Sequence, residues 1–119
     1  MAAPNIVNVT TIRGNTAVMN VTTVSSNIAV NPAGSNTVFK INTLLISNIN
    51  GANTAEITAN FFRSDIPYAI VSTVIVPADA SLVVISKETA IYLEEGDTIR
   101  LQASANGDLQ AICSYEEIS

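Results

Sequence analysis

The stretch IYLEEGDTIRLQASANGDLQAICSY, residues 91–115, decides how the rest of the chain is interpreted. From Ile99 to Ala105 every second side chain is apolar, and the same alternation returns from Leu109 to Tyr115. A period of two is typical of a β-strand that buries one face. The stretch therefore predicts two strands, each with one face in a core, separated by Asn106-Gly107-Asp108.

The loop between these strands predicts how they would pair in a hairpin, because directly opposite side chains share a face. Asn-Gly is the usual signal for a two-residue type I′ turn, but that turn would set Leu109 opposite Ser104. A three-residue loop sets apolar residues opposite one another, with Leu101 opposite Cys113. We therefore expect a hairpin with a three-residue loop, and a bulge beside the turn would reconcile the two signals.

The composition predicts one domain that touches other chains. A chain of 119 residues can bury one real core, so we expect a single β domain over residues 1–119. Hydrophobic residues make up 48% of the chain but charged residues only 13%, about half the usual share. The surface must therefore be covered mainly by Asn, Thr and Ser. High Val, Ile and Thr content favours β-structure, and low charge favours broad protein–protein contact, since interface cores are depleted in charge.

The charge and the missing residue types exclude several functions. A net charge of −5 argues against nucleic acid and anionic membranes as partners, because both call for clustered Lys and Arg. The five basic residues are scattered: Arg13, Lys40, Arg63, Lys87 and Arg100. The absence of histidine excludes imidazole metal sites, serine triads and Cys-His dyads. We expect no enzyme activity, no cofactor and no metal.

The beginning of the chain and its apolar runs bear on localisation. The start at Met1 lacks the basic and apolar regions of a secretory signal, and no apolar run reaches the ~20 residues of a membrane helix. We therefore expect a chain that stays in a cytosol or assembles there. The single cysteine, Cys113, excludes an internal disulfide, and we expect it on the inward face of the last strand.

Residues 1–36 differ from the rest in their high Asn, Thr and Val content. The run Val7–Ile12 is echoed by Met19–Val24, which predicts a hairpin that turns at Arg13-Gly14-Asn15. Asn31–Asn36 combines proline, glycine and Asn residues and is predicted to be a loop and an internal boundary. We therefore expect residues 1–36 to be an edge hairpin or an arm that lies on a neighbouring subunit.

The middle of the chain alternates between apolar runs and turn signals. The composition of Leu82–Ile85 predicts burial on both faces. Turns are expected at residues 49–53, 64–67 and 77–80, and strands at residues 37–48, 55–63, 68–76, 81–86 and 91–93. Turn signals at this spacing predict an all-β fold, an antiparallel β-sandwich of jelly-roll or immunoglobulin-like type with about seven to nine strands.

Glu94-Glu95-Gly96-Asp97 is the densest acidic cluster, and Asp108 would join it if the loops gathered at one end of the sandwich. Oxygen-rich loops can hold calcium, but acidic residues beside a glycine are equally typical of a solvated turn, which we expect here. Paired carboxylates could also hydrolyse glycosides. The chain has no tryptophan and few aromatic residues with which to line a sugar cleft.

Other residues suggest contact surfaces. Glu116-Glu117 could be a docking tail, although a chain end is usually solvated. Tyr68, Tyr92 and Tyr115 could belong to an interface, where tyrosine is favoured, or could be amphipathic residues at sheet edges. The glycines each occur alone and build no phosphate-binding loop: Gly14, Gly34, Gly51, Gly96 and Gly107.

Three segments carry a resemblance to a known group of proteins: residues 75–85, residues 91–105 and residues 114–118. They resemble small virion-associated proteins of tailed phages, particularly T4-like phages of marine cyanobacteria, and the likeness covers residues 37–118. The resemblance implies a structural protein of the virion, a head decoration, neck or tail component present in several copies. It implies assembly in the host cytoplasm, with other virion proteins and further copies as partners, and no catalytic residues.

A different function remains open beside this one. A β-sandwich can carry a carbohydrate- or receptor-binding site on its loops. The candidate loops for such a module are Asn50–Asn53 and Asn106–Asp108.

Overall fold

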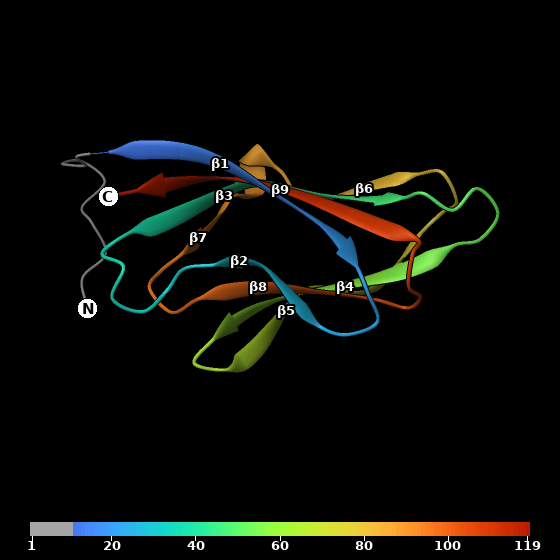
Figure 1. The fold of residues 1–119 in the computed structure, drawn as a ribbon, viewed down its shortest axis with the longest axis horizontal. Helices are drawn as coiled ribbons and strands as arrows, with labels where there is room; N and C mark the ends of the chain where they lie inside the picture. Colours follow the sequence, from blue (N-terminus) through green and yellow to red (C-terminus); the bar gives the residue numbers. More distant parts are fainter. Residues whose placement is uncertain (1–10) are drawn as a thin grey trace.

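The computed structural model describes residues 11–119, which form two antiparallel sheets packed face to face (Figure 1). Sheet A, the upper layer in Figure 1, has the strand order β1 (Ile12–Val21), β9 (Leu109–Ile118), β3 (Val38–Asn48) and β6 (Ser81–Ile85), with β7 (Ile91–Leu93) also paired to β3. Sheet B has the order β2 (Ser26–Val30), β8 (Thr98–Ala103), β4 (Ala55–Arg63) and β5 (Ile66–Val76). The predicted antiparallel β-sandwich is confirmed, with nine strands among residues 11–119.

The core lies between the sheets and is built from the apolar phase of each strand. In β3, Ile41, Leu44 and Ile46 are fully buried. Cys113 of β9 lies beside Leu44 in the same sheet, Leu101 of β8 comes from the opposite sheet, and neither has any exposed surface. Burying one such aliphatic side chain contributes roughly 1.5–3 kcal/mol. The predicted inward faces of the last two strands and the inward position of Cys113 are confirmed.

The predicted hairpin between the last two strands is wrong. β8 pairs with β2 and β4 in sheet B, whereas β9 pairs with β1 and β3 in sheet A. Residues 104–108 therefore cross from one sheet to the other. An alternating pattern fixes which face of a strand is buried, but two strands that face each other across a core satisfy it as well as two neighbours do.

The predicted N-terminal hairpin is also wrong in the part that the structure describes. β1 runs straight through Arg13-Gly14-Asn15 while pairing with β9, so the chain does not turn there. Val7–Thr10 lie outside the described residues. Residues 11–36 instead give one edge strand to each sheet, β1 to sheet A and β2 to sheet B. The loop predicted at residues 31–36 is confirmed, because it connects β2 to β3.

The edge strands are more exposed than their composition predicts. β6 is an edge strand, and Val83 is 58% exposed, so the predicted burial of Leu82–Ile85 on both faces is wrong. The turn before β5 is narrower than predicted and consists of Ser64 and Asp65, both with positive φ, as in a tight hairpin. Among residues 11–119 there is no helix of the length and apolarity needed to cross a membrane.

Candidate functional site

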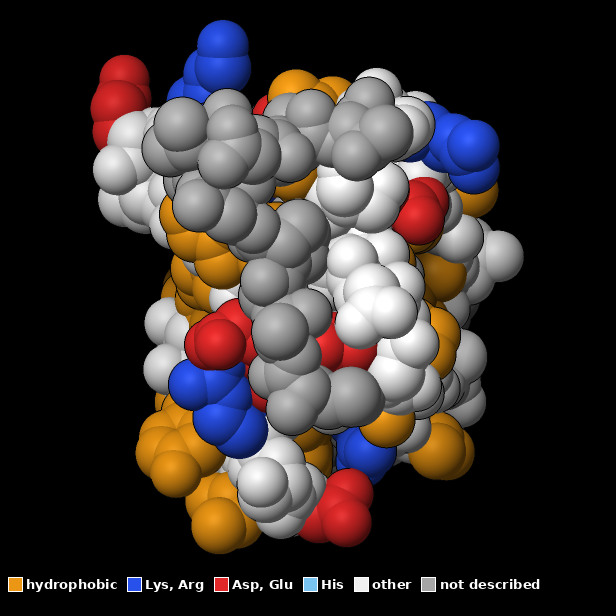
Figure 2. Space-filling view, turned by 90° about the vertical axis from the view of Figure 1, so that its left-hand side faces the viewer, with side chains coloured by type: hydrophobic (Ala, Val, Ile, Leu, Met, Phe, Trp, Pro, Cys, Tyr) orange, Lys and Arg blue, Asp and Glu red, His pale blue; other side chains and the backbone are white. Residues whose placement is uncertain are grey.

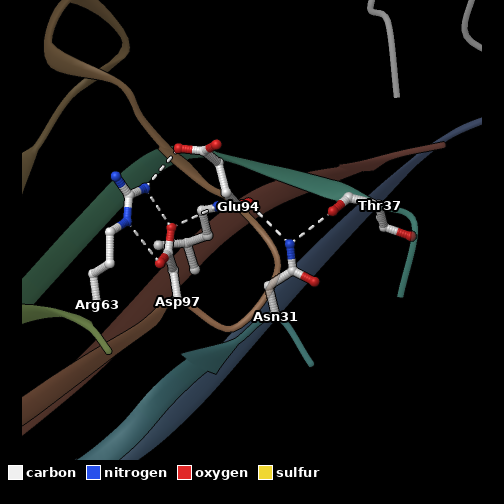
Figure 3. Close-up of polar contacts among 6 residues, drawn as sticks. Asn31, Thr37, Arg63, Glu94 and Asp97 are labelled. Carbon is white, nitrogen blue, oxygen red and sulfur yellow. Dashed lines mark hydrogen bonds and ion pairs between the residues drawn. The ribbon is translucent and has the colours of Figure 1, made fainter. Parts of the chain in front are cut away.

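The acidic turn Glu94–Asp97 joins β7 to β8 at one end of the sandwich, and Arg63 at the end of β4 reaches into it. Figure 2 shows this end, where acidic and basic side chains lie against one another. Arg63 donates from Nε to Asp97 Oδ1 at 3.0 Å and from Nη2 to Asp97 Oδ2 at 2.7 Å (Figure 3). Its Nη2 also lies 2.7 Å from Glu94 Oε2. This fork geometry matches a carboxylate well.

The surroundings of Asp97 indicate that its carboxylate has a structural role. Its side chain is only 3% exposed, and its Oδ2 also accepts a hydrogen bond from the backbone N–H of Glu94 at 2.8 Å. The hydrogen bond to Asp97 raises the pKa of the Arg63 guanidinium above its already high ordinary value, so the cation is always present. The carboxylate therefore closes a turn and balances a fixed positive charge.

Asn31, at the end of β2, ties the same turn to both sheets, and sequence reasoning missed it. Its side chain is fully buried, and its Nδ2 donates to the carbonyl oxygens of Thr37 at 2.8 Å and Leu93 at 2.9 Å (Figure 3). Its Oδ1 accepts from Ser35 Oγ at 2.6 Å. A buried amide with all these partners fixes loop positions that apolar packing alone would leave free. Nothing local in the sequence distinguishes this asparagine from its exposed neighbours.

The condition for Asp108 to join the acidic turn, that the loops gather at one end, is not met. β8 separates them and runs about 3.3 Å per residue, so Asp108 lies at the opposite end of the sandwich (Figure 1). There its Oδ1 accepts from Asn50 Nδ2 at 3.1 Å, and its carbonyl oxygen accepts from the backbone N–H of Ile49 at 2.7 Å. Among residues 11–119, no group of three or more His, Cys, Asp or Glu side chains is placed to hold a metal ion.

The loops Asn50–Asn53 and Asn106–Asp108 lie together at this second end, beside a buried asparagine. Asn48 is 3% exposed and donates from Nδ2 to the carbonyl oxygens of Asn53 and Val76, both at 3.0 Å. Asn106 Oδ1 accepts from the backbone N–H of Thr23 at 2.9 Å. The two ends of the sandwich are thus closed in the same way, by an asparagine whose amide nitrogen bridges two carbonyl groups.

The remaining predicted contact residues do not form one surface. Glu116 and Glu117 lie within β9, so they are not a tail, and Glu117 accepts a hydrogen bond from the Asn15 side chain. Tyr115 stacks on Phe39 with ring centroids 5.1 Å apart, and burial, followed by the charge of Glu117, raises its pKa. The other two tyrosines are exposed on different sheets, Tyr68 on β5 and Tyr92 on β7.

The outer face of sheet A carries an apolar row that was not predicted. Directly paired positions on four of its five strands place four apolar side chains side by side: Val18 of β1, Ile112 of β9, Leu45 of β3 and Val83 of β6. Val18 is 72% exposed, Val83 58% and Ile112 44%. Ile112 occurs between Gln110 and Ser114 in the polar phase of its strand, and this apolar residue in a polar phase was the signal available in the sequence.

A row of polar side chains borders the apolar row, and a shallow depression of about 350 Å³ lies where the two rows meet. Gln110 Nε2 donates to Asn20 Oδ1 at 3.1 Å, and the hydroxyls of Ser47 and Ser81 lie 3.2 Å apart. These contacts pair polar side chains of neighbouring strands with one another. The face is therefore uncharged where the apolar row crosses it, and the depression lies beside that row.

No family model matches the chain, and no curated protein matches it. A solved structure resembles it over 100% of this chain and 96% of the other, with a TM-score of 0.55 and 13% sequence identity. That structure is described by the words "Bacillus endospore appendages form a novel family of disulfide-linked pili". At this identity the likeness shows that the two chains share a fold.

Proposed function

We propose that the chain is a non-enzymatic structural protein of a phage virion, a head decoration, neck or tail component that acts by assembling with copies of itself and with other virion proteins. The observation that carries this proposal is the exposed apolar row on the outer face of sheet A. Exposed apolar side chains that adjoin one another mark contact sites, whereas singly scattered ones do not. The resemblance of residues 37–118 to small virion-associated proteins supports the placement in a phage particle.

The pilus structure supports the coarser part of the proposal, because it shows the same fold in an assembled appendage. Those pili are described as disulfide-linked, whereas this chain has no exposed cysteine with which to form such a link. Its single cysteine, Cys113, is buried in the core with no exposed surface. Contacts between copies of this chain are therefore non-covalent and depend on its surface side chains.

The acidic residues also support a structural role. Asp97 and Glu94 bind Arg63, and Asp108 holds the loop of Asn50. A catalytic carboxylate has to reach a substrate, and these carboxylates are committed to contacts that shape loops. Their arrangement stabilises loops and is consistent with a structural protein.

The experiment that tests the proposal is quantitative mass spectrometry of purified phage particles from the source culture. We expect the chain in many copies per particle, together with a solution mass above that of one chain. A chain that is absent from particles and stays monomeric at all concentrations would overturn the proposal.

A carbohydrate- or receptor-binding module is the second candidate, and the meeting of the loops Asn50–Asn53 and Asn106–Asp108 at one end favours it. A glycan array tests it. Saturable binding that is lost on Asn106→Ala and kept on the exposed sheet-A variant Val18→Ala would support this candidate, and no binding would remove it.

A further inference from the structure

The outer face of sheet A is a grid of side chains whose rows are fixed by the strand register. The strand order is β1, β9 and β3, followed by β6 along one half of β3 and β7 along the other. Four consecutive outward rows, counted from the end at Ser47, are Asn20, Gln110, Ser47 and Ser81; Val18, Ile112, Leu45 and Val83; Thr16, Ser114 and Thr43; and Gly14, Glu116, Lys40 and Tyr92. No described element covers these rows (Figure 1).

The charged side chains of the grid are one cation and one anion in neighbouring positions. Lys40 of β3 pairs directly with Glu116 of β9, and both are half-buried. The ion pairs found among residues 11–119 all involve Arg63, so the Lys40 ammonium group is not in contact with the Glu116 carboxylate of the same chain. Each is available to a charge that approaches from above the sheet.

We propose that this face binds the same face of a second copy, related by a two-fold axis that runs along the strands between β9 and β3. This inference deepens the proposed function and depends on it. The rotation places β9 of one copy opposite β3 of the other. Each row of one copy therefore lies opposite the same row of the other copy, with the order of its residues reversed. Lys40 then faces Glu116 of the second copy, and Glu116 faces its Lys40, so one operation forms two ion pairs and gives every charge of the grid a partner.

The other rows match under the same rotation. Val18 faces Val83 of the second copy and Ile112 faces its Leu45, so apolar side chains meet apolar ones. Tyr92, which is 44% exposed, faces Gly14, whose missing side chain leaves open space around its Cβ position. Two sheets that pack face to face lie about 10 Å apart with interdigitating side chains, which this alternation of large and small residues permits.

Charge also favours a second copy as the occupant. Each chain carries a net charge of −5, so most approaches of two copies are repelled. The grid has equal numbers of positive and negative charges, and the two-fold arrangement turns both into attractions. The contact covers roughly 400 Å² of flat sheet per copy, from about 4.8 Å between strands and about 3.3 Å per residue. That is the size of a weak dimer or of one contact in a larger assembly.

The test uses charge reversals in the full chain, with sedimentation velocity as the readout. Lys40→Glu sets two glutamates opposite each other in both halves of the dimer, and Glu116→Lys does the same with lysines. Each variant alone should dimerise about tenfold more weakly than the original chain. A mixture of the two variants should recover the original affinity, because every pair in the mixed dimer is then attractive.

Lys87→Glu and Glu88→Lys are matched controls on the exposed turn η1 (Lys87–Thr89), outside the grid. They change the net charge by the same amounts, so we expect them to dimerise like each other and to gain nothing on mixing. Val18→Asp should abolish dimerisation, whereas Ile75→Asp on sheet B, at a site 59% exposed, should keep it. Circular dichroism confirms that each variant is folded.

Three outcomes would overturn the inference. They are a chain that stays monomeric, a dimer that ignores the reversals at Lys40 and Glu116, and a mixture of these variants that pairs no better than either alone. The second and third would leave the proposed function standing, because the chain would still assemble through another face. A monomer that is nevertheless abundant in phage particles would refute only the self-contact.

Discussion

Replacing Asn31 by aspartate tests whether the buried amide holds the end of the sandwich together. The two side chains have nearly the same shape, but aspartate presents an acceptor where Asn31 Nδ2 now donates to Thr37 and Leu93 carbonyl oxygens. Two buried carbonyl groups would lose their donor, at about 1–3 kcal/mol each, and a carboxylate would be buried beside them. We expect Asn31→Asp to lower the free energy of unfolding by about 3–5 kcal/mol at neutral pH.

The assay is denaturant unfolding at several pH values, with Asn20→Asp as the matched control. Asn20 is exposed and its Oδ1 accepts from Gln110, a role that aspartate can keep, so the control should lose less than about 0.5 kcal/mol. Burial beside carbonyl groups raises the pKa of the new carboxyl in the folded state. Its protonated form can donate one hydrogen bond, so the deficit should be smallest in acid and grow as the pH rises. Equal stability of the two variants at neutral pH would refute the reasoning.

Three further predictions concern the core, the ion pair and the thiol. Leu101→Ala should cost about 2–5 kcal/mol in unfolding free energy, because Leu101 has no exposed surface; a loss below about 0.5 kcal/mol would mean that its face is reversed. Arg63→Ala should cost about 2–3 kcal/mol because it leaves the carboxylate of Asp97 buried without its cation. Glu94→Gln should cost at most about 1 kcal/mol, since that pair is exposed, and equal losses would contradict the distinction. Burial raises the pKa of the Cys113 thiol to about 11 from 9.0, so its contribution to stability is complete below pH 9 and is lost as the pH rises through about 11. Two pKa units correspond to about 3 kcal/mol, and pH titrations of stability should show Cys113→Ala losing that much less than the original chain once the pH is above about 11; parallel curves would show that the thiol is not the cause.

The faces of the strands could be predicted from the sequence, because alternation is a local property. Leu101 and Cys113 are inward as their phase indicates. The pairing of β8 and β9 could not be predicted in this way, since strands in opposite sheets show the same alternation as hairpin neighbours. The burial of Val83 was likewise mispredicted from composition, because an edge strand can be as apolar as a central one.

The positions of the polar residues depend on tertiary structure even more than the pairing of the strands does. Glu94 and Asp97 could be predicted to lie in a turn, but their cation, Arg63, arrives from a strand about thirty residues away and is close only because β4 and β8 are neighbours. Asp108 is separated from them by the length of β8. Ile112, in contrast, was readable as an apolar residue in a polar phase, and it marks the face on which both proposals depend.

Sedimentation equilibrium of the full chain over a wide concentration range tests most directly whether copies of this β-sandwich associate with one another. The mass of one chain is 12.5 kDa. The proposed face predicts an average mass that rises with concentration to at least twice that value. A mass that stays at 12.5 kDa throughout would contradict it.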